Sequence, residues 1–202
     1  MLSVALLLPT LALAEGETGC DPKYQALTDN AVVELTGTGD LDITVVTDPL
    51  CWHCRLGHKL LSEYPHLYRT MHVVFSPRRS FIGSDMAAWI LEDAAGTDSL
   101  KDKMDFAYKH LRQPKTDDLD EARMVILQQF LVFFPQMMEG TTPDALFARL
   151  QKDHEGHVLL TSALGNEAKL LGTPTLIAGQ TILMGYGAGP WIKALESPKL
   201  CP

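Results

Sequence analysis

Residues 47–55 read Thr-Asp-Pro-Leu-Cys-Trp-His-Cys-Arg, which places a Cys-X-X-Cys pair between a predicted strand and a predicted helix. Before the pair, residues 41–46 are rich in apolar and β-branched side chains, which favours a largely buried strand. After the pair, apolar residues recur at helical spacing until Pro65 ends the run. We therefore expect Cys51 at the N-terminal edge of a helix and Cys54 one turn inside it.

The predicted position of Cys51 favours a reactive thiolate. Free backbone N–H groups and the positive end of the helix dipole stabilise an anion there, and a protonated His53 in the same turn would add to this. Cys54 lies within bonding range of Cys51, so the two sulfurs can close or open a disulfide. The pattern predicts a two-electron redox switch with Cys51, Cys54 and His53 as candidate catalytic residues.

Two other interpretations of the cysteine pair stay open, a fixed structural disulfide and half of a metal site. A structural zinc ion needs four nitrogen or sulfur ligands. Cys20 and Cys201 are single and distant in the sequence, although His53 or His58 could serve as ligands. Because the strand-to-helix context favours redox chemistry, we assign no metal ligand and expect no bound cofactor.

The strand, the cysteine pair and the helix together resemble the thioredoxin superfamily. The Trp-His dipeptide between the cysteines most resembles the DsbA-like thiol-disulfide oxidoreductases, whose motif carries His at this place. Residues 172–176, Gly-Thr-Pro-Thr-Leu, resemble the cis-proline loop that faces the cysteines in that family. The resemblance implies that Pro174 is cis. It also implies that the Thr173 backbone pairs with a substrate chain beside Cys51, and it extends over residues 30–196.

The chain departs from this family at two positions. Trp52 occupies the place of a proline in the common DsbA motif, and we interpret it as a platform that faces the substrate. Val45 occupies the place, six residues before the first cysteine, where the family often buries an acid that accepts the proton of the second thiol. Asp48, His58 or a water molecule could substitute for that acid, and the sequence does not choose among them.

The order of predicted elements is β-α-β, a helical block, and then β-β-α. In the first unit, the helix after the cysteines leads to a predicted strand at residues 71–75, which favours a right-handed parallel crossover. This order indicates an α/β protein with a thioredoxin-like fold and a DsbA-type helical insertion; an α/β domain with a separate helical bundle is the alternative. The sequence predicts a signal peptide at residues 1–14 and an N-terminal arm at residues 15–30. The thioredoxin-like domain follows in two parts, residues 31–83 and 172–202, and the helical insertion occupies residues 84–171 between them.

Glycine and proline residues predict several turns and helix ends. Residues 37–40 indicate a hairpin-like turn between a short strand at residues 31–35 and the strand before the cysteines. The insertion is expected to hold five helices, with Pro143 opening the fourth and Gly172 capping the fifth. Gly179 and Gln180 predict a two-residue hairpin turn.

Composition excludes some partners. The chain has 202 residues, 46% of them hydrophobic, which suits one globular domain. Its net charge of −8 and its lack of a Lys/Arg cluster argue against binding to nucleic acid or to an anionic lipid surface. We therefore expect protein partners and, by default, a monomer.

The first residues predict export. Met1 to Ala14 are apolar and uncharged and end in Ala-Leu-Ala, which is typical of a secretory signal cut before Glu15. A membrane anchor and a lipoprotein signal are the alternatives. Export to an oxidising compartment, such as the periplasm, makes a disulfide between Cys20 and Cys201 plausible. Two independent terminal thiols remain the other possibility.

The expected function is an exported thiol-disulfide oxidoreductase, most simply a dithiol oxidase that introduces disulfides into unfolded or cysteine-containing exported proteins. Family resemblance implies re-oxidation by a quinone-coupled membrane protein. A reductase or isomerase is the nearest alternative, since Thr173 before the proline resembles the DsbC and DsbG isomerases. A periplasmic copper- or zinc-handling protein is a further alternative, because two thiolates are soft ligands.

Overall fold

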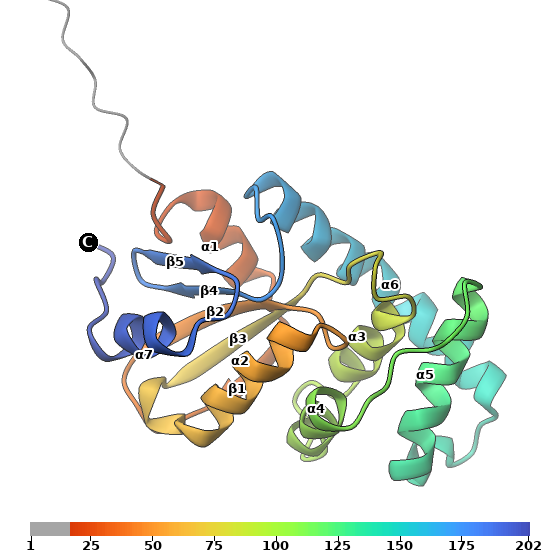
Figure 1. Cartoon of the computed structure of the whole chain (residues 1–202). Coiled ribbons are helices and arrows are strands. Elements are labelled where there is room, and N and C mark those ends of the chain that lie inside the picture. The colour runs from red at the N-terminus through yellow and green to blue at the C-terminus, as the bar shows by residue number, and fades with distance from the viewer. Residues whose placement is uncertain (1–16) are drawn as a thin grey trace, which may run out of the picture.

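The computed structural model describes residues 17–202. The predicted signal peptide, residues 1–14, lies outside the described residues. The protein is of the α/β class, with a five-stranded sheet, helices on both of its faces and a block of helices to one side (Figure 1). Within residues 17–202, no helix combines the length and the apolar character needed to cross a membrane.

The sheet has the strand order β1-β3-β2-β4-β5. Strands β2 and β3 run parallel and are joined through helix α2, as predicted, and every other neighbouring pair is antiparallel. The central strand β2 is the one that leads to the cysteine pair. The bounds of the strands and of α2 are β1 Val33–Thr36, β2 Asp42–Thr47, α2 Trp52–Glu63, β3 Thr70–Phe75, β4 Thr175–Ala178 and β5 Thr181–Met184.

The predicted hairpin between the first two strands is wrong. Strand β1 pairs with β3, with Val33 opposite Val73, so β3 lies between β1 and β2. The turn packs on the start of β3, where the Gly37 N–H donates to the Arg69 carbonyl at 2.8 Å. A Cβ on Gly37 would lie 2.2 Å from the Tyr68 carbonyl oxygen, so the glycine permits this close backbone approach.

The sequence predicts a loosely held N-terminal arm at residues 15–30 in which only Tyr24 and Leu27 could pack. These two residues do pack, but the segment is a helix for most of its described length. Helix α1, Pro22–Asp29, lies on the sheet, and Tyr24 and Leu27 are fully buried against residues of β2, β3 and β4. The prediction failed because only these two apolar side chains mark the helix in a polar segment. Their burial, and not local helix propensity, holds the segment in place.

The helical block contains α3 Ser84–Asp93, α4 Leu100–Lys109, α5 Leu119–Phe133 and α6 Pro143–Glu167. Two separate helices were predicted over the range of α6, and the structure has one helix of 25 residues. Its apolar pattern changes because its neighbours change. Leu146 and Leu150 pack in the helical block, whereas Thr161 donates to the Phe75 carbonyl of β3 at 2.8 Å.

The end of α6 also differs from the prediction, which placed a glycine cap at Gly172. Lys169 adopts the left-handed conformation, with φ of 57°. The Lys169 N–H donates to the Asn166 carbonyl and the Leu170 N–H to the Gly165 carbonyl, each at 2.9 Å. This is a Schellman motif in which Lys169 takes the position usual for glycine, and α6 ends at Glu167, before the predicted cap at Gly172.

Two apolar cores lie on the two faces of the sheet. The larger one joins α2, the helical block and Trp191 of helix α7, Ala188–Glu196, to the face that carries Val45 and Val73. The smaller one joins α1 and the end of α6 to the face that carries Val46 and Val74. Alternate side chains of β2 and β3 therefore pack in opposite cores. This packing fixes the orientation of β2, and β2 leads directly to the cysteine pair at the end of the sheet.

Candidate functional site

Cys51 begins helix α2, as the sequence predicts. Strand β2 ends at Thr47, and the Cys51 N–H donates to the Asp48 carbonyl at 3.1 Å to form a tight turn. Cys51 is the N-cap residue with extended backbone angles, and its carbonyl accepts the first helical hydrogen bond from Arg55 at 3.1 Å. The N–H groups of the first turn are thus free to face the Cys51 sulfur.

Both cysteines of the pair are free thiols and both are buried, with exposed fractions of 5% for Cys51 and 2% for Cys54. The Cys51 Sγ lies 3.5 Å from the Thr173 carbonyl oxygen. The Cys54 Sγ accepts a hydrogen bond from the Asp48 N–H at 3.4 Å. The structure therefore represents the reduced form, with Cys51 toward the proline loop and Cys54 behind it.

The two thiols have very different acidities. A hydrogen bond from the Cys54 thiol, followed by the backbone N–H groups of Cys54 and His53 and a contact with Thr173, lowers the pKa of Cys51 to about 5 against the effect of its own burial. Burial raises the pKa of Cys54, and the neighbouring Cys51 raises it further. Near neutral pH, Cys51 is a thiolate and Cys54 a thiol that donates to it.

Trp52 and His53 both point into solvent. The side chain of Trp52 is 65% exposed, and His53 is exposed as well. His53 stabilises the Cys51 anion through its backbone N–H. No hydrogen bond joins its imidazole to another described residue. The predicted role of the His53 side chain therefore rests on charge alone.

The proline loop lies against Cys51. The Thr173–Pro174 peptide bond is cis. The Pro174 carbonyl accepts from the Gly185 N–H at 2.7 Å, and the Leu171 carbonyl accepts from the Arg78 guanidinium at 3.0 Å. The structure thus brings Cys51, Cys54, Thr173 and Pro174 together although 122 residues separate Cys51 from Thr173.

Cys20 and Cys201 lie elsewhere and form a disulfide with each other. The adjacent segments meet the hairpin turn after β4, where the Gly19 N–H donates to the Gln180 carbonyl and the Gln180 N–H to the Lys199 carbonyl. This turn lies at the end of the sheet where β2 begins, because β4 runs antiparallel to β2. The bridge is therefore at the opposite end of the sheet from Cys51.

Asp48 is a buried carboxylate beside the pair. Its two oxygens accept from the Leu50 N–H at 2.8 Å, from the Arg78 N–H at 2.7 Å and from the Ser84 hydroxyl at 3.2 Å. Burial raises the pKa of Asp48 to about 7, although these three donors favour its anion. Asp48 therefore ties the cysteine turn to the segment that enters the helical block.

The sequence did not identify the residues that the helical block adds to the site. The hydroxyl of Tyr108, on α4, hydrogen-bonds that of Thr47 at 3.0 Å, and Asp105, on the same helix, pairs with His58 at 3.0 Å. Tyr108 lies 61 residues from Thr47 in the sequence, and Asp105 lies 47 residues from His58. Neither helical residue stands in a motif, so no local signal could have found them.

The described residues offer little to a metal ion. Among residues 17–202, no three or more His, Cys, Asp or Glu side chains are grouped so that they could hold one. Near the pair, the side chains suited to a soft metal are the two thiols and His58, whose imidazole lines a small cavity with Cys54, while His53 is exposed to solvent.

No protein-family model matches this sequence, and a search of curated proteins found no match. Solved structures do match. A periplasmic thioredoxin-like protein from Salmonella enterica serovar Typhimurium is similar at a TM-score of 0.61 and 18% identity, over 87% of this chain and 94% of that one. ScsC from Proteus mirabilis is similar at 0.61 and 17% identity, over 86% and 76% of the two chains.

The thiol-disulfide exchange protein alpha-DsbA2 from Wolbachia pipientis is also similar, at a TM-score of 0.57 and 15% identity, over 88% of this chain and 94% of that one. At these identities the likeness concerns the fold. The chain has the thioredoxin-like fold with a DsbA-type helical insertion that its sequence predicts.

Proposed function

We propose that this chain is an exported thiol-disulfide oxidoreductase that uses Cys51 and Cys54 to introduce disulfides into other proteins. The observation that carries the proposal is the contrast between a Cys51 thiolate, with a pKa of about 5, and a buried Cys54 thiol that donates to it. Stabilisation of the thiolate stabilises the dithiol form, and a stable dithiol makes the disulfide form a strong oxidant.

The proposed cycle begins with the Cys51–Cys54 disulfide. A client thiolate attacks the Cys51 sulfur, the bond between the two cysteines breaks, and Cys54 leaves and takes up a proton. A second client thiolate then attacks the client sulfur of the mixed disulfide and displaces Cys51, whose low pKa makes it a good leaving group. The client gains one disulfide and the enzyme ends as the dithiol.

The surroundings of Cys51 suit an extended client chain. The Thr173 and Pro174 backbone lies beside the sulfur. Three apolar side chains near these residues are exposed. The exposed fractions are 65% for Trp52, which follows Cys51, 82% for Leu171, which precedes the proline loop, and 54% for Met184, which pairs with Thr175 in the sheet. An unfolded client can offer both backbone groups and apolar side chains, and we propose Trp52, Thr173 and Pro174 as its contacts.

The return to the disulfide form needs an electron acceptor. We propose a quinone-coupled membrane protein in the same exported compartment. The support for export is the predicted signal peptide, the Cys20–Cys201 disulfide, which suits an oxidising compartment, and the fold shared with a periplasmic protein of Salmonella enterica.

A reductase or an isomerase would use the same two cysteines, so the redox potential decides between them. We expect equilibration of the Cys51–Cys54 pair with glutathione to give a value nearer the about −120 mV of strong oxidants than the about −270 mV of thioredoxin. A value near that of thioredoxin would overturn the oxidase proposal. Copurification of copper or zinc with the protein would instead favour the metal-handling alternative.

A further inference from the structure

Cys54 needs a proton-transfer partner, and the position of the missing acid is occupied by Val45. If the proposed function holds, Cys54 takes up one proton when its disulfide opens and gives up one when the disulfide is formed again. The thiol is buried and shielded from bulk water. A route for this proton must therefore pass through side chains or a trapped water molecule.

A small cavity lies directly behind Cys54. Val45, Cys54 and Tyr108 line it, together with Thr47 and His58 and with apolar side chains of α2, β3 and α4. Its volume is about 10 Å³, at the lower limit for a single water molecule, which needs roughly 10 to 15 Å³. Its walls carry a thiol, two hydroxyls and an imidazole, which are enough partners for that water.

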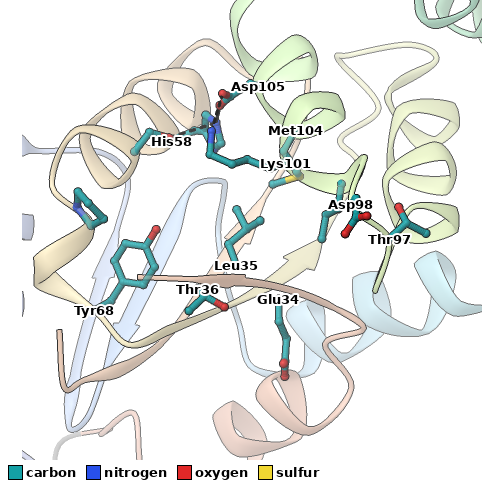
Figure 2. A pocket seen from close by; sticks show the side chains of 13 residues that line it. Glu34, Leu35, Thr36, His58, Tyr68, Thr97, Asp98, Lys101, Met104 and Asp105 are labelled. Carbon is teal, nitrogen blue, oxygen red and sulfur yellow. Dashed lines mark hydrogen bonds and ion pairs between the residues drawn. The ribbon is translucent and has the colours of Figure 1, made fainter. Parts of the chain in front are cut away.

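His58 separates this cavity from solvent together with Met104 and Tyr108, which also line both the cavity and an outer pocket. Of these three side chains, His58 alone lines both outer pockets. The same imidazole lines an outer pocket of about 410 Å³ between α2 and α4, shown in Figure 2, and a second outer groove of about 600 Å³ beside Trp52. In Figure 2 its ring is joined to Asp105 on α4, with the two atoms 3.0 Å apart. The ring also stacks on Tyr108, with centroids 4.6 Å apart.

The surroundings of His58 keep its imidazole neutral, so that it can accept a proton. Burial lowers the pKa of His58, against the opposing effect of Asp105. Burial alone would raise the pKa of Asp105, but hydrogen bonds from His58, Lys109 and Lys101 lower it to about 2. Asp105 is thus a carboxylate that accepts the Nε2–H of neutral His58, with the Ser62 hydroxyl 3.4 Å from the same nitrogen. Nδ1 has no hydrogen bond to another described residue and keeps its lone pair.

From this geometry we propose that His58, positioned by Asp105, exchanges the proton of Cys54 with solvent through the cavity. During re-oxidation Cys51 is held in a mixed disulfide with the oxidant, itself a disulfide. The Cys54 thiol passes its proton to His58 through one water, and its thiolate attacks the Cys51 sulfur. The bond from Cys51 to the oxidant breaks, the oxidant sulfur leaves as a thiolate, and His58 releases the proton toward the outer pocket.

Asp48 is the competing candidate, and its contacts argue against it. Its N–H, not its carboxylate, meets Cys54. Both carboxylate oxygens are occupied by donors from Leu50, Arg78 and Ser84, and Asp48 does not line the cavity.

The test uses the reduced protein and dithiobis(nitrobenzoate), a disulfide that releases a coloured thiolate at each step. The first phase reports attack by Cys51, and the second reports closure by Cys54. In His58→Asn we expect an unchanged first phase and a second phase slowed about 100-fold at neutral pH, in line with general-base contributions of about 10²–10⁴. Asp105→Asn should also slow the second phase, but by a smaller factor than His58→Asn does, because the imidazole is still present.

His72→Asn is the matched control, because His72 pairs with Glu34 at 3.1 Å and its neighbours Met71 and Val73, not His72, face the core that holds Cys54. Both phases should stay unchanged in it. In His58→Asn, the second phase should become hydroxide-dependent and rise with pH, whereas in wild type it should level off once His58 is neutral.

A second phase at the wild-type rate in both His58→Asn and His58→Gln would overturn the proposal. So would a slow second phase with the wild-type pH profile, because packing damage would explain it. Loss of the first phase in wild type would instead count against the proposed function, so the two failures can be told apart.

Discussion

The hydroxyls of Thr47 and Tyr108 lie 3.0 Å apart although 61 residues separate them in the sequence. Thr47 is the last residue of β2, the strand that leads to the cysteine pair, and Tyr108 belongs to the helical insertion. The bond crosses directly behind Cys54, because both residues line the cavity there. The insertion therefore forms part of the proposed redox site and does more than cover the sheet.

Removal of the Tyr108 hydroxyl should destabilise the protein. In Tyr108→Phe the buried Thr47 hydroxyl loses its partner, and we expect the free energy of unfolding to fall by about 1 to 2 kcal/mol. Urea unfolding of the reduced protein measures this. Tyr64→Phe is the control, since Tyr64 is exposed, and its effect should stay within about 0.5 kcal/mol.

The hydrogen bond from Cys54 should account for much of the Cys51 acidity. In Cys54→Ala we expect the pKa of Cys51 to rise, because the largest contribution to its lowering is that bond. In Cys54→Ser, where a hydroxyl can still donate, the rise should be smaller. Titration of the ultraviolet absorbance of the thiolate measures both, and equal shifts in the two variants would contradict this assignment.

The two Cys54 variants should also accumulate mixed disulfides with clients, since the resolving thiol is gone. Their absence on a non-reducing gel would argue against exchange through Cys51. Cys51→Ala should trap none.

The His53 side chain should have a small effect. Because the ring is exposed and its backbone N–H survives substitution, we expect His53→Ala to raise the pKa of Cys51 by less than about 1 unit, in keeping with the about 1 kcal/mol or less of exposed charge pairs. The same absorbance titration measures it. A larger rise would show that the imidazole charge matters more than its exposure suggests.

The reduced form should gain stability over the oxidised form as pH rises. The folded pKa of Cys51 is about 5, below the about 8.5 of an unfolded cysteine. Between these values the unfolded chain binds more protons, so the free energy of unfolding rises with pH by up to about 1.4 kcal/mol per unit. This contribution is lost as pH falls through the folded pKa.

Urea unfolding of both redox forms across this range measures the difference. The raised pKa of Asp48, about 7, makes stability fall as pH rises from about 4 to 7. Because Asp48 is present in both forms, most of its effect cancels in the difference. Cys51→Ser has no disulfide form, so it is compared with the reduced wild type, and its free energy of unfolding should no longer rise with pH between about 5 and 8.5. A rise that persists in this variant would assign the effect to another group.

Loss of the Cys20–Cys201 bridge should cost stability and leave the chemistry alone. We expect Cys201→Ala to lower the free energy of unfolding by about 2 to 5 kcal/mol, because the bridge closes a very long loop. The double variant with Cys20→Ala should cost no more than the single one. The pKa of Cys51 should stay the same, since the bridge lies at the far end of the sheet.

The sequence predicted what depends on short-range patterns. The cysteine pair at the start of α2, the parallel β2–β3 crossover and the hairpin at Gly179 each follow from residues that are neighbours in the chain. The pairing of β1 with β3 could not be predicted in this way, because a strand's partner depends on long-range packing. The same holds for the contact of His58 with Asp105, which depends on how α4 docks on α2.

Two segments connect the sheet to the helical block. One is helix α6, which runs unbroken between them, and the other is residues 76–84, which Asp48 holds through the Arg78 N–H and the Ser84 hydroxyl. Neither segment offers a hinge, since one is a continuous helix and the other is fastened by a buried carboxylate. The two halves should therefore move as one rigid body. Any change of shape needed for binding must then occur in the client protein. Flexible, unfolded clients should therefore react much faster than compactly folded ones.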